Sequence, residues 1–135
     1  MIRSLARSAV VLSFVLAACG DGDPVAPSTP TVLTSGAGVT NISGGANSQK
    51  VYRIVVATGA TSLTVTTSGG SGDADIYVRR GSPPTATSVD DCDSTGLDNN
   101  ETCVLDAPAT GDWFVLLYGA ESYSGVTLTA TVTRP

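Results

Sequence analysis

The sequence lacks histidine, and it has a single lysine, few aromatic side chains and only 14% charged residues. Without histidine, the usual Ser/His/Asp and Cys/His nucleophile systems and His-containing zinc sites are excluded. Net charge is -5, whereas nucleic-acid binding needs clustered Lys and Arg, so we expect no nucleic-acid partner. Hydrophobic residues make up 41% of the 135, which argues against disorder and for one folded domain.

The first segment has the pattern of an export signal. Arg3 and Arg7 precede an apolar run at 9–18, and the tetrad LAAC ends this run at Cys19. The run is too short to span a bilayer, which takes about 20 residues, and small residues at its end are typical of a cleavage site. LAAC resembles the lipobox of bacterial lipoproteins, whose cysteine carries diacylglycerol. We predict a lipoprotein signal peptide at 1–18 and lipidation of Cys19; the alternative is a plain secretory peptide.

This anchor predicts an exported protein held at the cell envelope by its lipid. Removing residues 1–18 takes away two arginines and changes the net charge to -7, so electrostatic attachment to an anionic membrane is not expected. Gly20 after the cysteine is compatible with outer-membrane sorting. Residues 19–37 are rich in Pro, Ser, Thr and Gly and predict an extended tether, with a first strand within 31–34 as the alternative.

From residue 38 to 135 the pattern changes to alternation with a period of two, and no sustained helical period is present. The clearest case is 126–132, where apolar residues alternate with threonines. Strands are predicted at 49–57, 61–67, 73–80, 101–105, 111–118 and 126–132, separated by Gly-rich turns. Many short strands with this spacing predict an all-β fold, a single antiparallel β-sandwich with Trp113 as its largest core or edge-sealing side chain.

Cys92 and Cys103 flank a polar loop and are predicted to form a structural disulfide, since disulfides persist in exported proteins. A metal or redox pair is the competing interpretation. The spacing between the two cysteines fits neither a zinc ribbon nor a C-x-x-C motif.

Several consecutive motifs resemble the bacterial pre-peptidase C-terminal (PPC) domain between about Val39 and Val132. They are VTNISG (39–44), SGGSGDADIYVRRGSPPT (68–85), NNETC (99–103), PATGDWFVLLYG (108–119) and SYSGVTLTATV (122–132). The resemblance implies a jelly-roll type of sandwich that is not catalytic and that usually follows the catalytic domain of secreted peptidases. It also implies kinship with the collagen-binding domains of clostridial collagenases. No peptidase precedes the domain here, so we expect a freestanding, membrane-tethered version.

The chemical candidate within these motifs is the pair Asp73 and Asp75. Carboxylates at i and i+2 of an extended segment point the same way and can both offer oxygens to calcium. No cofactor other than calcium is expected. Further ligands would come from the acidic loop, which contains Asp91, Asp93, Asp98, Asn99, Asn100 and Glu101. The alternative is that Asp73 caps the Gly-rich turn, while Asp75 pairs with Arg79 or Arg80 or bonds backbone amides.

Tyr77, Tyr118 and Tyr123 are the candidate ligand-binding residues, with packing over the edge of the core as the alternative. We expect no enzyme. The sequence predicts a binding module for extracellular protein or polysaccharide, and the second hypothesis is a secretion-assisting or peptidase-accessory role in trans.

Overall fold

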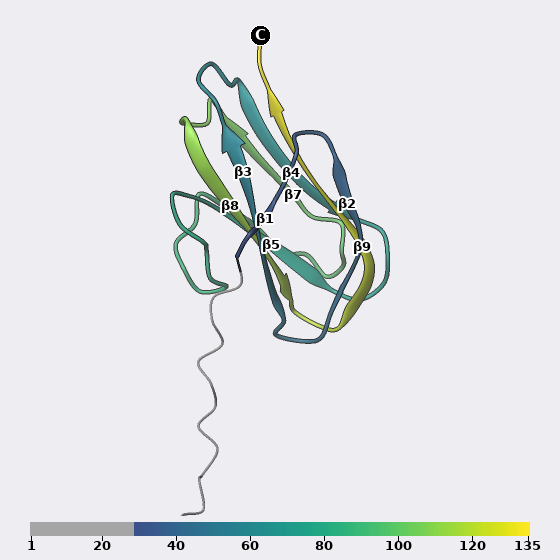
Figure 1. The fold of residues 1–135 in the computed structure, drawn as a ribbon. Coiled ribbons are helices and arrows are strands. Elements are labelled where there is room, and N and C mark those ends of the chain that lie inside the picture. Colours follow the sequence, from purple (N-terminus) through teal and green to yellow (C-terminus); the bar gives the residue numbers. More distant parts are fainter. Residues whose placement is uncertain (1–28) are drawn as a thin grey trace, which may run out of the picture.

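The computed structural model describes residues 29–135, which contain strands and turns but no helix (Figure 1). The strands are β1 (Thr31–Val32), β2 (Gly38–Gly44), β3 (Gln49–Val56), β4 (Ser62–Ser68), β5 (Ala74–Arg80), β6 (Cys92–Ser94), β7 (Thr102–Asp106), β8 (Gly111–Gly119) and β9 (Tyr123–Thr133). Accordingly, no helix within this range is long and apolar enough to cross a membrane.

The strands form two sheets that pack face to face. One sheet has the order β1-β3-β8-β5-β6 and the other the order β2-β9-β4-β7. All neighbours run antiparallel except β1, which lies parallel to β3. The runs 3-8-5-6 and 2-9-4-7 are the strand orders of two interleaved Greek keys, which make a jelly roll. The predicted all-β antiparallel sandwich is confirmed.

Alternating side chains fill the space between the sheets. In β9, Val126, Leu128 and Ala130 are fully buried and the threonines between them are half-buried. Trp113 is 4% exposed, and its indole nitrogen donates a hydrogen bond to the carbonyl of Ala109 at 2.9 Å. The core also includes Ile54, Val56, Leu63, Val65, Ile76, Val78, Val115 and Leu117. The six predicted strands are confirmed within a few residues at their ends.

Two strands were not predicted because they lack clean alternation. In β2, the pairing with β9 is interrupted by two register shifts, and Asn41 has a φ of 57°, in the left-handed region. A bulge of this kind breaks the period of two. Strand β6 is only three residues long and polar, so its sequence carries no strand signal.

The tether prediction for residues 19–37 is wrong at its C-terminal end, because the domain begins near Thr31. Thr31–Val32 pairs with β3, and the amide of Leu33 donates a hydrogen bond to the carbonyl of Arg53 at 2.8 Å. The Leu33 side chain is 5% exposed and belongs to the core. Burial of Leu33 holds this segment against the domain, although its Pro- and Thr-rich composition is typical of a linker. The predicted signal peptide, Cys19 and the remainder of the tether lie outside the described residues.

The predicted disulfide is confirmed. Cys92 and Cys103 are bonded, with 5.9 Å between their Cα atoms. Cys92 lies on β6 and Cys103 on β7, which are edge strands of different sheets. The bond therefore joins the two sheets along one side of the sandwich.

Replacing both cysteines with serine should lower the free energy of unfolding by about 2–3 kcal/mol, because the closed loop restricts the unfolded chain. Chemical denaturation measures this difference. Reductant should destabilise the parent protein by a similar amount and leave the double variant unchanged. A variant as stable as its parent would contradict a stabilising role for this bond.

The turn before β5 packs tightly against the turn between β8 and β9. Gly72 has a φ of +97°, and a Cβ atom there would lie 2.0 Å from the carbonyl oxygen of Ser122. The amide of Glu121 donates a hydrogen bond to the carbonyl of Asp73 at 3.1 Å. Only glycine fits this position, and it fixes the residues that follow it.

We expect Gly72→Ala to lower the free energy of unfolding by roughly 2–4 kcal/mol, through backbone strain and the clash with Ser122. Gly45→Ala is the matched control, since a Cβ atom at Gly45 would meet nothing within 4 Å. Thermal melts of the two variants measure the difference, and equal melting temperatures would refute the tight packing of this turn.

Candidate functional site

The solvent side of the sheet β3-β8-β5, called the outer face below, carries most of the candidate binding residues. Strand register places them in three rows across the sheet: Gln49, Tyr118 and Asp75; Val51, Leu116 and Tyr77; Arg53, Phe114 and Arg79. Residues directly opposite one another in an antiparallel pair share a face. Aromatic, apolar and cationic side chains therefore gather on one surface from strands distant in the sequence.

Tyr77 and Tyr118, both predicted as ligand-binding residues, lie together on the outer face. Their ring centroids are 6.4 Å apart, and the rings are nearly perpendicular, at 80°. The Tyr118 hydroxyl donates a hydrogen bond to Oδ1 of Asn47 at 2.6 Å. Burial, followed by the nearby carboxylates of Asp75 and Asp93, raises the pKa of Tyr77. Both rings are half-buried, and each retains an accessible part.

Tyr123 was predicted as a third binding residue, and this prediction is wrong. Its side chain is 3% exposed and packs in the core, and burial raises the pKa of its hydroxyl. The cause is a bulge in β9, where Gly125 has a φ of +72° and the register with β2 shifts between Val126 and Tyr123. Tyr123 and Val126 are three positions apart, so a regular strand would place them on opposite faces. The bulge adds one residue and brings both onto the inner face.

Leu116 shows that the outer face is partly covered. It is fully buried, but it does not belong to the core between the sheets. The loop between β5 and β6 folds back onto β5, since the amide of Asp91 donates to the carbonyl of Val78 at 3.0 Å. Oδ2 of Asp91 in turn accepts a hydrogen bond from the amide of Arg80 at 2.8 Å. This loop forms one wall of a surface hollow.

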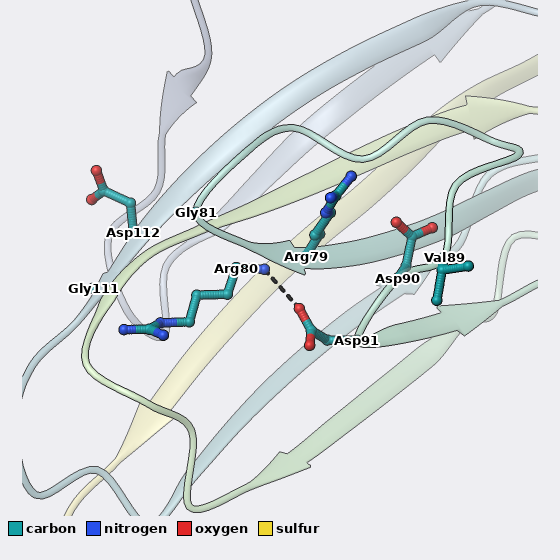
Figure 2. Close-up of a pocket in the computed structure, with 8 residues that line it drawn as sticks. All are labelled: Arg79, Arg80, Gly81, Val89, Asp90, Asp91, Gly111 and Asp112. Carbon is teal, nitrogen blue, oxygen red and sulfur yellow. Dashed lines mark hydrogen bonds between the residues drawn. The ribbon is translucent and has the colours of Figure 1, made fainter.

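The hollow has a volume of about 490 Å³ and is of mixed charge (Figure 2). It is lined by Arg79, Arg80, Gly81, Val89, Asp90, Asp91, Gly111 and Asp112. Figure 2 shows Arg80 extending toward Gly111, while Arg79 leaves β5 in another direction, toward the β5–β6 loop. Sequence reasoning missed this hollow because its walls come from three separate segments.

The three arginine side chains near the hollow differ in their hydrogen-bond partners. Arg53 forms a salt bridge with Asp112, at 3.1 Å to each carboxylate oxygen, and Arg80 donates to the carbonyl of Thr110 at 2.6 Å. Arg79 makes no ion pair or hydrogen bond with any residue in 29–135. Its guanidinium is left available to an incoming acceptor, and the 93% exposed Val89 lines the same hollow.

Asp73 and Asp75, the predicted calcium ligands, lie at the start of β5. Asp75 is only 6% exposed, and the Oδ1 atoms of both carboxylates are buried without a hydrogen-bond partner. Burial raises the pKa of Asp75 to about 6, and the charges of Asp73 and Glu101 add to this effect. The alternative prediction, a turn cap at Asp73 with an ion pair or backbone bond at Asp75, is not what the structure shows.

The acidic loop contributes Asn99 and Glu101 to the same region. Asn99 is 3% exposed; its Nδ2 donates to the carbonyl of Gly69 at 3.1 Å, and its Oδ1 is buried without a partner. The Glu101 carboxylate accepts hydrogen bonds from the hydroxyl of Ser94 and the amide of Gly96. Within residues 29–135, no three Asp, Glu, Cys or His side chains form a metal-holding group by themselves.

Comparison with known proteins agrees with this architecture. The model of the bacterial pre-peptidase C-terminal domain family matches residues 48–119. The chain is 41% identical over 112 residues to the alkaline serine exoprotease A of Vibrio alginolyticus, covering 83% of the chain and 20% of that protein. It is 44% identical over 114 residues to the virulence metalloprotease of Vibrio anguillarum, covering 84% and 18%. The chain thus spans about a fifth of the length of these two relatives.

Two solved structures share the fold. A solution structure described as vEP C-ter 100 superposes with a TM-score of 0.60 at 38% identity, covering 75% of this chain and 98% of that one. The crystal structure of the pre-peptidase C-terminal domain of collagenase from Bacillus anthracis gives a TM-score of 0.56 at 12% identity, with 80% and 98% covered. The family match, the relatives and the jelly-roll fold together establish that this chain belongs to the bacterial pre-peptidase C-terminal domain family.

Proposed function

We propose that this protein is an exported, non-catalytic binding module whose outer face attaches to extracellular protein or polysaccharide. The observation that carries the proposal is the pairing of Tyr77 and Tyr118 beside the available guanidinium of Arg79. Tyr and Arg are the residues most enriched at binding hot spots, because they combine apolar area with directed hydrogen bonds. An exposed sheet face suits an extended polymer better than a small molecule, which needs a deep pocket.

Protein is the ligand class that the mixed charge favours. The hollow is lined by Arg79, Asp90 and the exposed Val89, and Arg79 lies two residues after Tyr77 on the same face of β5. Peptides present charged, amide and apolar groups at the spacing of a few ångströms, whereas a neutral polysaccharide offers no charged group to pair with Arg79 or Asp90. The non-catalytic part of the proposal follows from membership of a family whose domain accompanies peptidase domains.

A second role is supported by the relatives themselves, which are proteases of which this domain forms a minor part. In this role the domain would act in trans, assisting a secreted peptidase or its export. Such a partner would be recognised through the same outer face, so the two roles differ in the ligand and not in the site.

Replacing both tyrosines, as Tyr77→Ala with Tyr118→Ala, should weaken binding by tenfold or more, since each is a hot-spot type of residue. The domain spanning residues 29–135 serves for this test, because a 38% identical relative was solved as the isolated domain. Retention is measured on insoluble collagen, casein, chitin and peptidoglycan, and on a secreted peptidase of the same organism.

Val104→Ala is the matched control, because Val104 is 56% exposed on β7 of the other sheet. It should bind like the parent, and the double tyrosine variant should keep its circular dichroism spectrum. Retention on the peptidase alone would favour the role in trans. If the double variant bound every support as tightly as the parent, the outer face would not be the binding surface.

For the anchor, we propose lipidation of Cys19 and attachment to the outer membrane, with the domain held on the exported side. Expression of the full chain with Cys19→Ser should move the protein from the membrane fraction to the soluble fraction, because the lipid is the expected attachment. Mass spectrometry of the parent should show a diacylglycerol-modified N-terminal cysteine. An unmodified cysteine, or a membrane-bound serine variant, would refute the proposed anchor.

A further inference from the structure

We propose that Asp73, Asp75 and Asn99 form a binding site for one hard divalent cation, and that this cation is Ca²⁺. The site lies where the turn before β5 meets the acidic loop before β7. Asp75 lies at the border of the outer face, beside Tyr118. The ion site does not rest on the binding role proposed for that face, because ion binding and ligand binding are measured separately.

Three segments are fastened together around this site. Asn99 bonds the carbonyl of Gly69, on the turn that leads to Asp73. Glu101 and Thr67 exchange hydrogen bonds: the amide of Thr67 donates to the carbonyl of Glu101 at 3.0 Å, and the amide of Glu101 donates to the Thr67 hydroxyl at 3.3 Å. The third segment is the turn between β8 and β9, where the amide of Glu121 donates a hydrogen bond to the carbonyl of Asp73.

Within this frame, oxygen atoms are left without donors. Asp75 and Asn99 are each more than nine-tenths buried, and Oδ1 of each has no hydrogen-bond partner, as is also true of Oδ1 of Asp73. Buried polar atoms in native proteins are almost always paired, because an unpaired one loses its hydration without compensation. Three orphan acceptors on adjoining segments indicate a missing positive partner.

Four other acidic residues of the region accept hydrogen bonds, although Oδ2 of Asp90 is also buried without a partner. Asp91 accepts a hydrogen bond from the amide of Arg80, Asp98 from the amide of Asn100, and Asp90 from the hydroxyl of Ser88. Glu101 is occupied by Ser94 and Gly96. The hydrogen bonds of these carboxylates stabilise the conformation of their own loops. The carboxylates of Asp73 and Asp75 accept no hydrogen bond from any residue in 29–135.

Charge points in the same direction. Asp75 is 6% exposed, and the only salt bridge among the described residues lies elsewhere, between Arg53 and Asp112. Asp75 is therefore a buried acid without an ion pair, which is costly unless it is neutralised. A divalent cation would neutralise two carboxylates at once.

The identity of the ion follows from the donor atoms. The side chains offer only oxygen, which excludes a nitrogen- or sulfur-loving ion such as Zn²⁺, because the sequence has no histidine and both described cysteines are in a disulfide. Ca²⁺ accepts six to eight oxygens in irregular arrangements, so carboxylates, an amide oxygen, backbone carbonyls and water together satisfy it. Mg²⁺ demands a strict octahedron and keeps its waters, which a site with two fixed carboxylates on one strand suits less well.

The test is a thermal melt of the 29–135 domain, freed of metal with chelator and then titrated with CaCl₂. We expect the melting temperature to rise by about 5–10 °C at millimolar Ca²⁺, since an ion that binds only the folded state stabilises it by mass action. Mg²⁺ at the same concentration should shift it by less than half as much. Isothermal titration should give one Ca²⁺ per chain.

Asp75→Asn should abolish the Ca²⁺ shift, and without Ca²⁺ it should melt no lower than the parent, because it removes a buried, unpaired charge. Asp73→Asn should also abolish the shift, and it serves if the first variant does not fold. Asp93→Asn is the matched control: it removes one exposed negative charge nearby and should keep the full Ca²⁺ response. A parent without a Ca²⁺ shift, or an equal shift in all variants, would overturn the proposal.

Discussion

The apolar contact between the inner faces of the two sheets is the constraint on which the remaining structure depends. Fully buried side chains such as Leu63, Ile76, Val115 and Leu128 meet there from strands of both sheets. Removing apolar surface from water is the dominant favourable term in folding, at about 25 cal/mol per Å². Because side chains alternate along a strand, fixing the inner positions also fixes which residues face outward. Tyr77, Tyr118 and Arg79 share one face for this reason.

Alternation in the sequence was sufficient to predict most of the sandwich. Strands β3, β4 and β9 have a clear period of two, and β8 is a continuous apolar run between turn residues. The cysteine pair could be assigned from its spacing and compartment. Where the backbone departs from regularity, prediction failed. Gly125 changes which face Tyr123 occupies, and β2 and β6 are respectively bulged and too short to give a pattern. Leu33 was missed because the residues before it resemble a linker.

The candidate sites depend on contacts that local sequence does not encode. Tyr77 and Tyr118 are brought together by the pairing of β5 with β8, and the register of that pair is set by the whole sheet. The sequence indicated that Asp73 and Asp75 point the same way, but only burial shows that they lack partners. Asn99 could be named only as one member of an acidic loop. Its bond to Gly69 is a tertiary contact between segments about 30 residues apart.

All four sheet edges of this domain are of a kind that resists pairing with another chain. β1 has two residues and β6 three, β2 is broken by two register shifts, and β7 is tied across to β6 by the disulfide. Short, irregular or covered edges are how β proteins avoid edge-to-edge aggregation. A sandwich with four protected edges can be fused to different protein domains, or packed densely on a surface, without its copies pairing through their edge strands.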